Sequence, residues 1–238
     1  MRKKIGISFT EAGFQNYWNW FSTAELAEDL ELLELSFEKG NTKDIEQCDG
    51  FVLTGGIDVT PSISGGAEDY PHRPAAFSPE RDEFERQIYE FAKTKRLPLL
   101  GVCRGMQYIN IMEGGAVFDD IGAPENELHK KGELDKAHEI KVVEGSLLGE
   151  ITGEDCGIVN SAHHQAVNPD RLGQNLMINA YAVSGKGIVE GLEYKDKTNS
   201  GFMIALQWHP ERMKEKESNP FSQKIKKQFI QEVRNQFI

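Results

Sequence analysis

The sequence has few cysteines and no long apolar run, and each shortage excludes a class of protein. Its three cysteines, Cys48, Cys103 and Cys156, are odd in number and form no CxxC pair. We therefore expect neither a disulfide framework nor a cysteine zinc knuckle. The apolar stretch near the N-terminus ends by Glu11, too early for the core of a signal peptide. These features predict a cytoplasmic protein that does not cross a membrane.

Basic residues are also in short supply. The 238 residues include 27 Lys and Arg against 38 Asp and Glu, a formal net charge of −11. The mean surface potential of such a chain repels phosphate backbones and anionic lipids. We expect a small-molecule substrate as partner, with no nucleic acid and no membrane surface.

Short β-rich runs alternate with helical periodicity in the first half of the chain, which is typical of parallel strands joined by crossover helices. Strands and turns prevail in the second half. The pattern predicts an α/β fold in one domain over residues 1–238, with the long loops 57–77 and 122–137 as lids or binding walls. The expected strands lie at 4–9, 50–53, 97–102, 138–143, 158–159, 176–183, 187–194 and 202–208.

Helix starts are marked by caps and prolines. A capping box formed by Ser22 and Glu25 predicts a helix. Proline at the first helical position predicts two more helices, one from Ser78-Pro79 and one from Asn219-Pro220 to the end of the sequence. The apolar face of the first helix is expected to carry Leu26, Leu30, Leu33 and Phe37.

Cys103 has the sequence context of a nucleophile. The apolar run that ends at Val102 passes through G-V-C-R-G into an expected helix over 107–112. Glycines two residues before and after a nucleophile allow the sharp strand-to-helix turn that projects its side chain. A helix N-terminus next to the sulfur also favours the thiolate. An inert buried thiol is the alternative, and the glycine spacing favours the nucleophile.

A cysteine nucleophile needs a base, and His209 is the candidate. His209 follows the expected strand 202–208, and catalytic groups of open α/β sheets gather at the carboxyl ends of strands. Glu211 is placed to hold the imidazole tautomer. A histidine in a surface turn is an equally good interpretation of this spacing.

Two backbone turns are candidates for an oxyanion hole. Gly55-Gly56 follows the expected strand 50–53, and a Gly-Gly turn lets a backbone N–H approach a ligand closely. Its N–H would act beside that of Arg104. An ordinary glycine turn is the alternative.

The segment Asn160-Ser-Ala-His-His-Gln165 is dense in hydrogen-bonding groups. Adjacent histidines of an extended chain point to opposite sides, and no third ligand stands at a spacing typical of a metal site. His72, His129 and His138 show no partner pattern. We therefore expect a polar pocket wall or a structural loop rather than a metal site, and no cofactor.

Together, G-V-C-R-G-M-Q, Gly114-Gly115, V-N-S-A-H-H-Q-A and Q-W-H-P-E resemble the motifs of the class I glutamine amidotransferase superfamily. With T-G-G-I-D-V-T-P upstream, they are most similar to its free-standing γ-glutamyl hydrolase branch. The resemblance implies a flavodoxin-like three-layer α/β/α sandwich with a mostly parallel sheet.

The same resemblance implies roles for individual residues. Cys103 would be the nucleophile, His209 the general base and acid, and Glu211 the carboxylate that orients it. The backbone N–H groups of Gly56 and Arg104 would form the oxyanion hole. The glutamyl end of the substrate would be held by Gly55, Gln107 and the backbone around His163, His164 and Gln165.

Three functions fit this sequence. The first is a cysteine-dependent hydrolase of γ-glutamyl amides such as γ-glutamyl-γ-aminobutyrate. The second is a glutaminase subunit that delivers ammonia to a separate synthase, and a homodimer is open under either. The third is a binding or stress-response protein with a vestigial cysteine, which the joint presence of Cys103, His209 and Glu211 disfavours.

Overall fold

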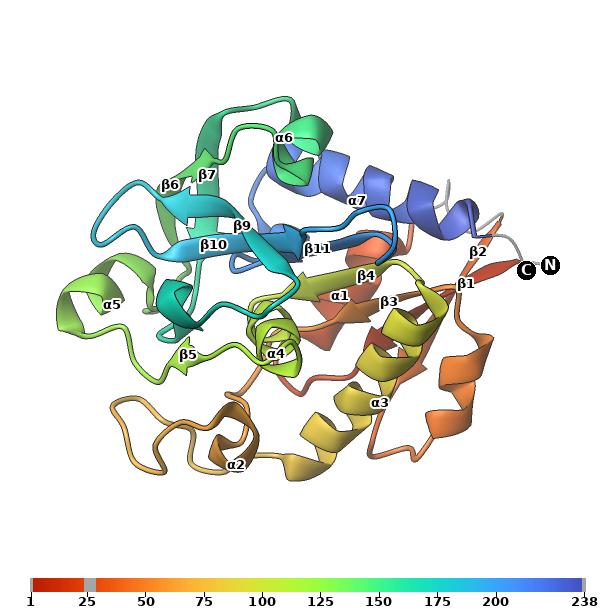
Figure 1. Cartoon of the computed structure of the whole chain (residues 1–238), viewed down its shortest axis with the longest axis horizontal. Coiled ribbons are helices and arrows are strands. Elements are labelled where there is room, and N and C mark those ends of the chain that lie inside the picture. Colours follow the sequence, from red (N-terminus) through yellow and green to blue (C-terminus); the bar gives the residue numbers. More distant parts are fainter. Residues whose placement is uncertain (1, 24–28, 237–238) are drawn as a thin grey trace.

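The structure is a computed structural model that describes residues 2–23 and 29–236, and a nine-stranded sheet lies at its centre (Figure 1). The strand order is β2-β1-β3-β4-β11-β10-β9-β6-β7. In chain order the strands are β1 (Lys3–Ser8), β2 (Leu30–Leu35), β3 (Gly50–Leu53), β4 (Leu99–Val102), β6 (Lys136–Val142), β7 (Cys156–Ser161), β9 (Leu176–Ala182), β10 (Val189–Tyr194) and β11 (Met203–Leu206). A separate two-stranded sheet pairs β5 (Val117–Phe118) with β8 (Ala166–Val167).

The sheet has a parallel half and an antiparallel half. All neighbouring strands from β2 to β11 pair in parallel, whereas those from β11 to β7 pair antiparallel. The parallel half is the flavodoxin-like part that the sequence predicts. Its β3, β4 and β11 end at the same edge, because Leu53 aligns with Gly101 and Leu206 aligns with Val102.

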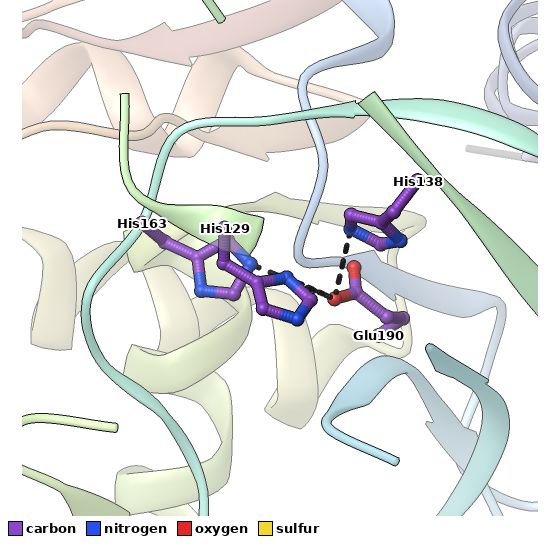
Figure 2. A group of neighbouring side chains, drawn as sticks. All are labelled: His129, His138, His163 and Glu190. Atoms are coloured by element: carbon purple, nitrogen blue, oxygen red, sulfur yellow. Dashed lines mark ion pairs between the residues drawn. The ribbon is translucent and has the colours of Figure 1, made fainter. Parts of the chain in front are cut away.

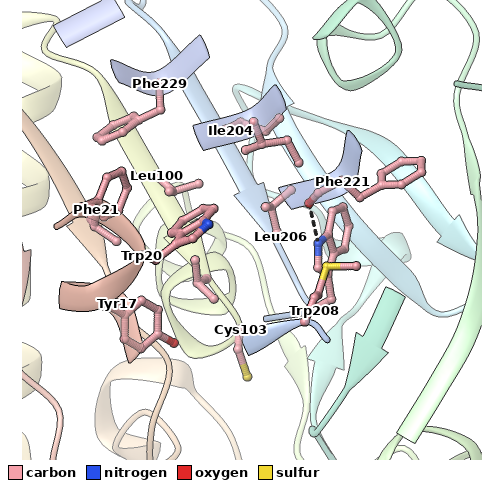
Figure 3. Packing of buried hydrophobic residues seen from close by; sticks show 14 of the residues in the cluster. Tyr17, Trp20, Phe21, Leu100, Cys103, Ile204, Leu206, Trp208, Phe221 and Phe229 are labelled. Carbon is pink, nitrogen blue, oxygen red and sulfur yellow. Dashed lines mark hydrogen bonds between the residues drawn. The ribbon is translucent and has the colours of Figure 1, made fainter. Parts of the chain in front are cut away.

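Helices cover both faces of the sheet, which makes three layers. Trp20 and Phe229 pack on one face and Ile88 and Met106 on the other, each within its own buried cluster. Figure 3 shows the first of these clusters, with Cys103 at one end of it. The helices are α1 (Phe14–Phe21), α2 (Pro61–Ser64), α3 (Pro79–Lys95), α4 (Arg104–Met112), α5 (Ala123–His129), α6 (Leu147–Thr152) and α7 (Pro220–Arg234), with 3-10 turns at Thr42–Gln47, Pro169–Arg171 and Pro210–Arg212.

The helix expected from Ser22 is wrong. Residues 30–35 form β2, which pairs with β1, and α1 lies earlier, at 14–21; Glu25 and Leu26 lie outside the described residues. The leucines of β2 serve both faces of the sheet: Leu30 joins the cluster under α1 and α7, and Leu35 joins the opposite cluster. Because the leucines of β2 face both sides of the sheet, their spacing resembles the apolar face of a helix. Pairing with β1 overrides the helical preference of Leu and Glu.

The other expected elements are confirmed to within a few residues. All eight expected strands are present, and the helices that start at Pro79 and Pro220 are present too, the second ending at Arg234. Neither long loop is free of structure, because 57–77 contains α2 and 122–137 contains α5 and the start of β6. Among the helices described, none is long and apolar enough to cross a membrane.

Candidate active site

Cys103 stands at the turn between β4 and α4, with φ 53° and ψ −106°. A positive φ is uncommon for a residue with a side chain and stores backbone strain. The two glycines make the turn feasible: a Cβ at Gly105 would lie 2.1 Å from the Leu53 carbonyl oxygen, and one at Gly101 would lie 2.7 Å from Ile109 Cδ1. The strand-to-helix turn predicted from the glycine spacing is therefore present.

His209 follows β11 and is buried, so it is not the surface histidine of the alternative interpretation. Its Nδ1 lies 2.9 Å from Oε1 of Glu211, which is also buried. Its backbone N–H donates to Asn160 Oδ1 at 3.1 Å. Burial alone would lower the pKa of His209, but the charges of Glu211 and Cys103 outweigh it and raise the pKa to about 9.

Gly55, just after β3, lies close to both His209 and Cys103. A Cβ at Gly55 would lie 2.9 Å from His209 Cε1 and 3.4 Å from Cys103 Cβ. The three segments that follow β3, β4 and β11 therefore meet at one place. The fold thus brings Gly55, Cys103 and His209 together at the carboxyl ends of these strands.

Tyr17 also belongs to this place, and the sequence did not reveal it. Its hydroxyl accepts a hydrogen bond from the Gly55 N–H at 2.9 Å and lies 3.3 Å from His209 Nδ1. Tyr17 is carried by α1, which the sequence analysis did not predict. The aromatic run at 14–21 was the available signal, but it does not single out this tyrosine.

The two expected oxyanion donors lie on elements joined by a buried ionic network. Gly56 has φ +139°, and a Cβ there would lie 2.3 Å from Arg81 Nη1. The Arg104 N–H opens α4, where an N–H has no acceptor within the helix. The side chain of Arg104 has a separate role, since its guanidinium bonds to Asp82 and Glu85. The guanidinium of Arg81 donates to the Gly55 carbonyl at 2.9 Å.

This network has compensated charges. Glu85 bonds to both guanidiniums, at 3.0 Å to Arg81 Nε. Burial would raise the pKa of Glu85, but the charges of Arg104 and Arg81 keep it below its usual value. The network links the Gly55-Gly56 turn to the start of α4, and no local sequence signal points to it.

The expected substrate-binding residues separate into two groups. Gln107 Nε2 donates to the Gln165 carbonyl at 3.3 Å and to Gln207 Oε1 at 3.1 Å, so Gln107 and Gln165 are neighbours. His163 and His164 point in opposite directions, as adjacent residues of an extended chain do. His164 meets Asp58 at 3.1 Å, whereas His163 enters a buried cluster.

That cluster consists of His129, His138, His163 and Glu190, and Figure 2 shows the ion pairs of all three rings converging on one oxygen of Glu190. Burial lowers the pKa of His129 to about 3 and that of His163 to about 4. Burial likewise raises the pKa of Glu190 to about 7. No sequence spacing connects these four positions, and only the fold brings them together.

Comparisons with known proteins agree with the fold and the motifs. A model of the family described as Peptidase C26 matches residues 34–211. The protein NtpR of Enterococcus hirae is 31% identical over 212 residues, which cover 86% of this chain and 82% of NtpR. Gamma-glutamyl-gamma-aminobutyrate hydrolase PuuD of Escherichia coli is 29% identical over 180 residues, which cover 70% of this chain and 65% of PuuD.

A solved structure shows the same fold. The glutaminase domain of Trypanosoma brucei CTPS with bound acivicin matches with a TM-score of 0.68 and 17% identity, over 99% of this chain and 95% of that one. The family match extends over more than half of this chain and includes Cys103, His209 and Glu211. The chain belongs to the Peptidase C26 family, among the class I glutamine amidotransferase-like hydrolases.

Proposed function

We propose that the protein hydrolyses γ-glutamyl amide bonds through a γ-glutamyl thioester on Cys103. The observation that carries this proposal is the meeting of Cys103, Gly55 and the His209–Glu211 pair at one edge of the sheet. A cysteine on a strand-to-helix turn beside a histidine with an orienting carboxylate is the arrangement that nucleophilic acyl transfer requires.

The first half-reaction forms the thioester. The Cys103 thiolate attacks the γ-carbonyl carbon, and the negative charge that develops on oxygen is stabilised by the N–H groups of Gly56 and Arg104. The C–N bond then breaks as protonated His209 gives its proton to the leaving amine. Glu211 keeps the imidazole oriented during the transfer, through its contact with Nδ1 at 2.9 Å.

The second half-reaction releases glutamate. Neutral His209 takes a proton from a water molecule, which attacks the thioester carbonyl carbon. The C–S bond breaks, and Cys103 leaves as a thiolate beside the newly protonated His209, which restores the starting state. We assign Gln107 and Gln165 to the glutamyl end, and the support is that Gln107 Nε2 donates to the backbone carbonyl of Gln165.

We assign γ-glutamyl conjugates as the substrate class, with γ-glutamyl-γ-aminobutyrate as the first member to try. The support is the family match and the relative PuuD, which is named for that activity. The other function open from the sequence, a glutaminase subunit serving a separate synthase, uses the same chemistry but needs a partner.

The deciding experiment measures glutamate release by the purified protein alone. The substrates are glutamine, γ-glutamyl-γ-aminobutyrate, γ-glutamyl dipeptides and a γ-glutamyl polyamine, and Cys103→Ala is the blank. Fast turnover of a conjugate with little turnover of glutamine is the expected result. No turnover of any substrate, while a glutamine-like electrophile still labels Cys103, would contradict a free-standing hydrolase and favour the glutaminase subunit.

A further inference from the structure

The cluster of His129, His138, His163 and Glu190 has no part in the proposed reaction. His129 lies in α5, His138 in β6 and Glu190 in β10, and His163 lies in the segment that follows β7. All four side chains are at least nine-tenths buried, and Glu190 is completely buried. Their ligand atoms all lie within 4.8 Å of one another. Three imidazoles and a carboxylate gathered without solvent need a chemical explanation, because burying such groups is costly.

Hydrogen bonds fix which ring nitrogen carries the proton in two of the histidines. His163 Nδ1 lies 2.9 Å from the Gln165 carbonyl oxygen, and His138 Nδ1 lies 3.3 Å from the Glu139 carbonyl oxygen. A carbonyl oxygen accepts only, so each Nδ1 carries the hydrogen. In the neutral rings Nε2 then carries no hydrogen and is an acceptor. In both histidines this nitrogen faces Glu190.

When Glu190 is ionised, the atoms that face one another are all acceptors. Within the described ranges, Nε2 of His138, Nε2 of His163 and both carboxylate oxygens of Glu190 have no hydrogen-bond partner. Buried acceptors left without a donor destabilise the folded state. A cation placed among them would satisfy all of them together.

The three separations measured from Glu190 are close to those around a small tetrahedral ion. Glu190 Oε1 lies 3.3 Å from His138 Nε2, 3.5 Å from His163 Nε2 and 3.5 Å from His129 Nδ1. Imidazole and carboxylate ligands at roughly 2.0–2.1 Å from Zn²⁺ would lie about 3.3–3.4 Å apart in a tetrahedron. The carboxylate oxygen thus stands at nearly the ligand separation that four-coordinate zinc requires.

We propose that His129, His138, His163 and Glu190 bind one divalent first-row transition-metal ion, with Zn²⁺ the best match to this donor set. The backbone carbonyls of Gln165 and Glu139 orient two of the rings, in the way that outer partners orient metal-bound histidines. Four protein ligands close the coordination sphere, which is the pattern of a structural site.

Such an ion would fix the segment that reaches the active site. His163 N–H donates to the His129 carbonyl at 3.1 Å, and the Gln165 carbonyl accepts from both His163 and Gln107. Metal binding would therefore hold α5, β6 and β10 to the backbone that carries Gln165. The sequence disfavoured a metal because adjacent histidines diverge, but the fold supplies the missing ligands from residues 129, 138 and 190.

A second histidine group provides a matched control. His72, His164 and Asp120 also lie close together, but this group is more exposed, and His72 already pairs with Asp120 at 2.9 Å. The substitution His72→Gln therefore removes an imidazole from the competing group and leaves the buried one intact.

The test uses the full chain purified without a histidine tag. The metal content is measured by elemental mass spectrometry, and protein stripped with a chelator is titrated with Co²⁺ while its visible spectrum is recorded. We expect one ion per chain and the intense absorption of tetrahedral cobalt for the wild type and for His72→Gln. Glu190→Gln and His138→Gln should bind about 100-fold more weakly or worse, since even losing an outer partner costs 10–100-fold.

Two results would overturn the proposal. One is wild-type protein that neither retains Zn²⁺ after dialysis nor develops the cobalt spectrum, which would mean that the cluster holds protons only. The other is loss of the metal in His72→Gln with retention in Glu190→Gln. If the cluster variants fail to fold, the wild-type titration alone decides, and no readout depends on the proposed hydrolase activity.

Discussion

The Tyr17 hydroxyl lies 3.3 Å from Nδ1 of His209, the ring nitrogen that also meets Glu211. The same hydroxyl accepts the hydrogen bond of Gly55 N–H, so one side chain of α1 fixes both the glycine turn and the imidazole. Tyr17 thus acts as a positioning residue for two segments that carry the proposed chemistry.

Replacing Tyr17 with phenylalanine tests this role. Tyr17→Phe leaves the buried Gly55 N–H without its acceptor, which should lower the free energy of unfolding by about 1–3 kcal/mol. Because the imidazole loses a neighbour, kcat for glutamate release should fall roughly tenfold, the equivalent of about 1.4 kcal/mol. Tyr181→Phe on β9, two strands away from β11, is the control. Equal kinetics in the two variants would remove Tyr17 from the positioning of His209.

The nucleophile has a direct test. Cys103→Ala should abolish glutamate release and leave the fold intact, measured by turnover and by circular dichroism. Cys103→Gly should also be inactive, yet more stable than Cys103→Ala by about 1 kcal/mol, because glycine tolerates the φ of 53° at this position. Chemical denaturation of the pair measures the difference. Retained turnover in either variant would exclude Cys103 as the nucleophile.

The pH dependence of catalysis should reflect His209. Its pKa is raised to about 9, so the imidazole stays protonated, and able to give its proton to the leaving amine, until the pH approaches that value. We expect kcat/KM for glutamate release to fall on the alkaline side with an apparent pKa of about 9. Glu211→Gln removes a charge that raises the pKa, so this limb should move to lower pH. Glu215→Gln, at an exposed position, is the control and should leave it unchanged.

The free energy of unfolding should also depend on the protonation of His209. The pKa of His209 is higher in the folded protein than its usual 6.5, so the protonated ring favours folding. This contribution is complete below pH 6.5 and is lost as the pH rises through about 9. Unfolding measured between these limits should show a decline that is smaller in Glu211→Gln. A decline of the same size in both proteins would show that another group is responsible.

Two glycine substitutions separate steric contact from backbone strain. Gly56→Ala places a Cβ 2.3 Å from Arg81 Nη1 at φ +139°, whereas Gly65→Ala meets nothing within 4 Å at φ +71°. Gly65→Ala should cost only the strain, about 1–2 kcal/mol. Gly56→Ala should cost more than this and also lower kcat, because it displaces an expected oxyanion donor. Thermal unfolding and glutamate release of the two variants provide the comparison.

Local features of this protein were predictable from its sequence. The turn at Cys103 depends on glycines two residues away, and helix α3 depends on Pro79 and its cap Ser78, so each signal lies beside the element that it specifies. The edge strand β2 was mistaken for a helix because its leucines serve two faces of the sheet. The local sequence pattern cannot distinguish a helix from a strand with two buried faces, because the pairing of the strand with its neighbour decides between them.

Features formed by distant residues were not predictable in this way. Arg104 was expected only as a backbone donor, yet its side chain bonds to Asp82 and Glu85 of α3. The cluster around Glu190 combines residues from one helix, two strands and the segment after β7, and no periodicity connects them. Such sites depend on the order of strands in the sheet, which the sequence pattern left undetermined.

The sheet changes from parallel to antiparallel pairing at β11, and the site residues follow strands on both sides of this change. Cys103 and His209 follow strands of the parallel half, whereas His163, His164 and Gln165 follow β7 at the far edge of the antiparallel half. The reacting residues therefore depend on one half of the sheet and the residues assigned to the glutamyl end partly on the other, and the two halves are joined where Asn160 of β7 accepts a hydrogen bond from the backbone N–H of His209. We expect substitutions in β7 to alter glutamyl binding and the position of His209 together.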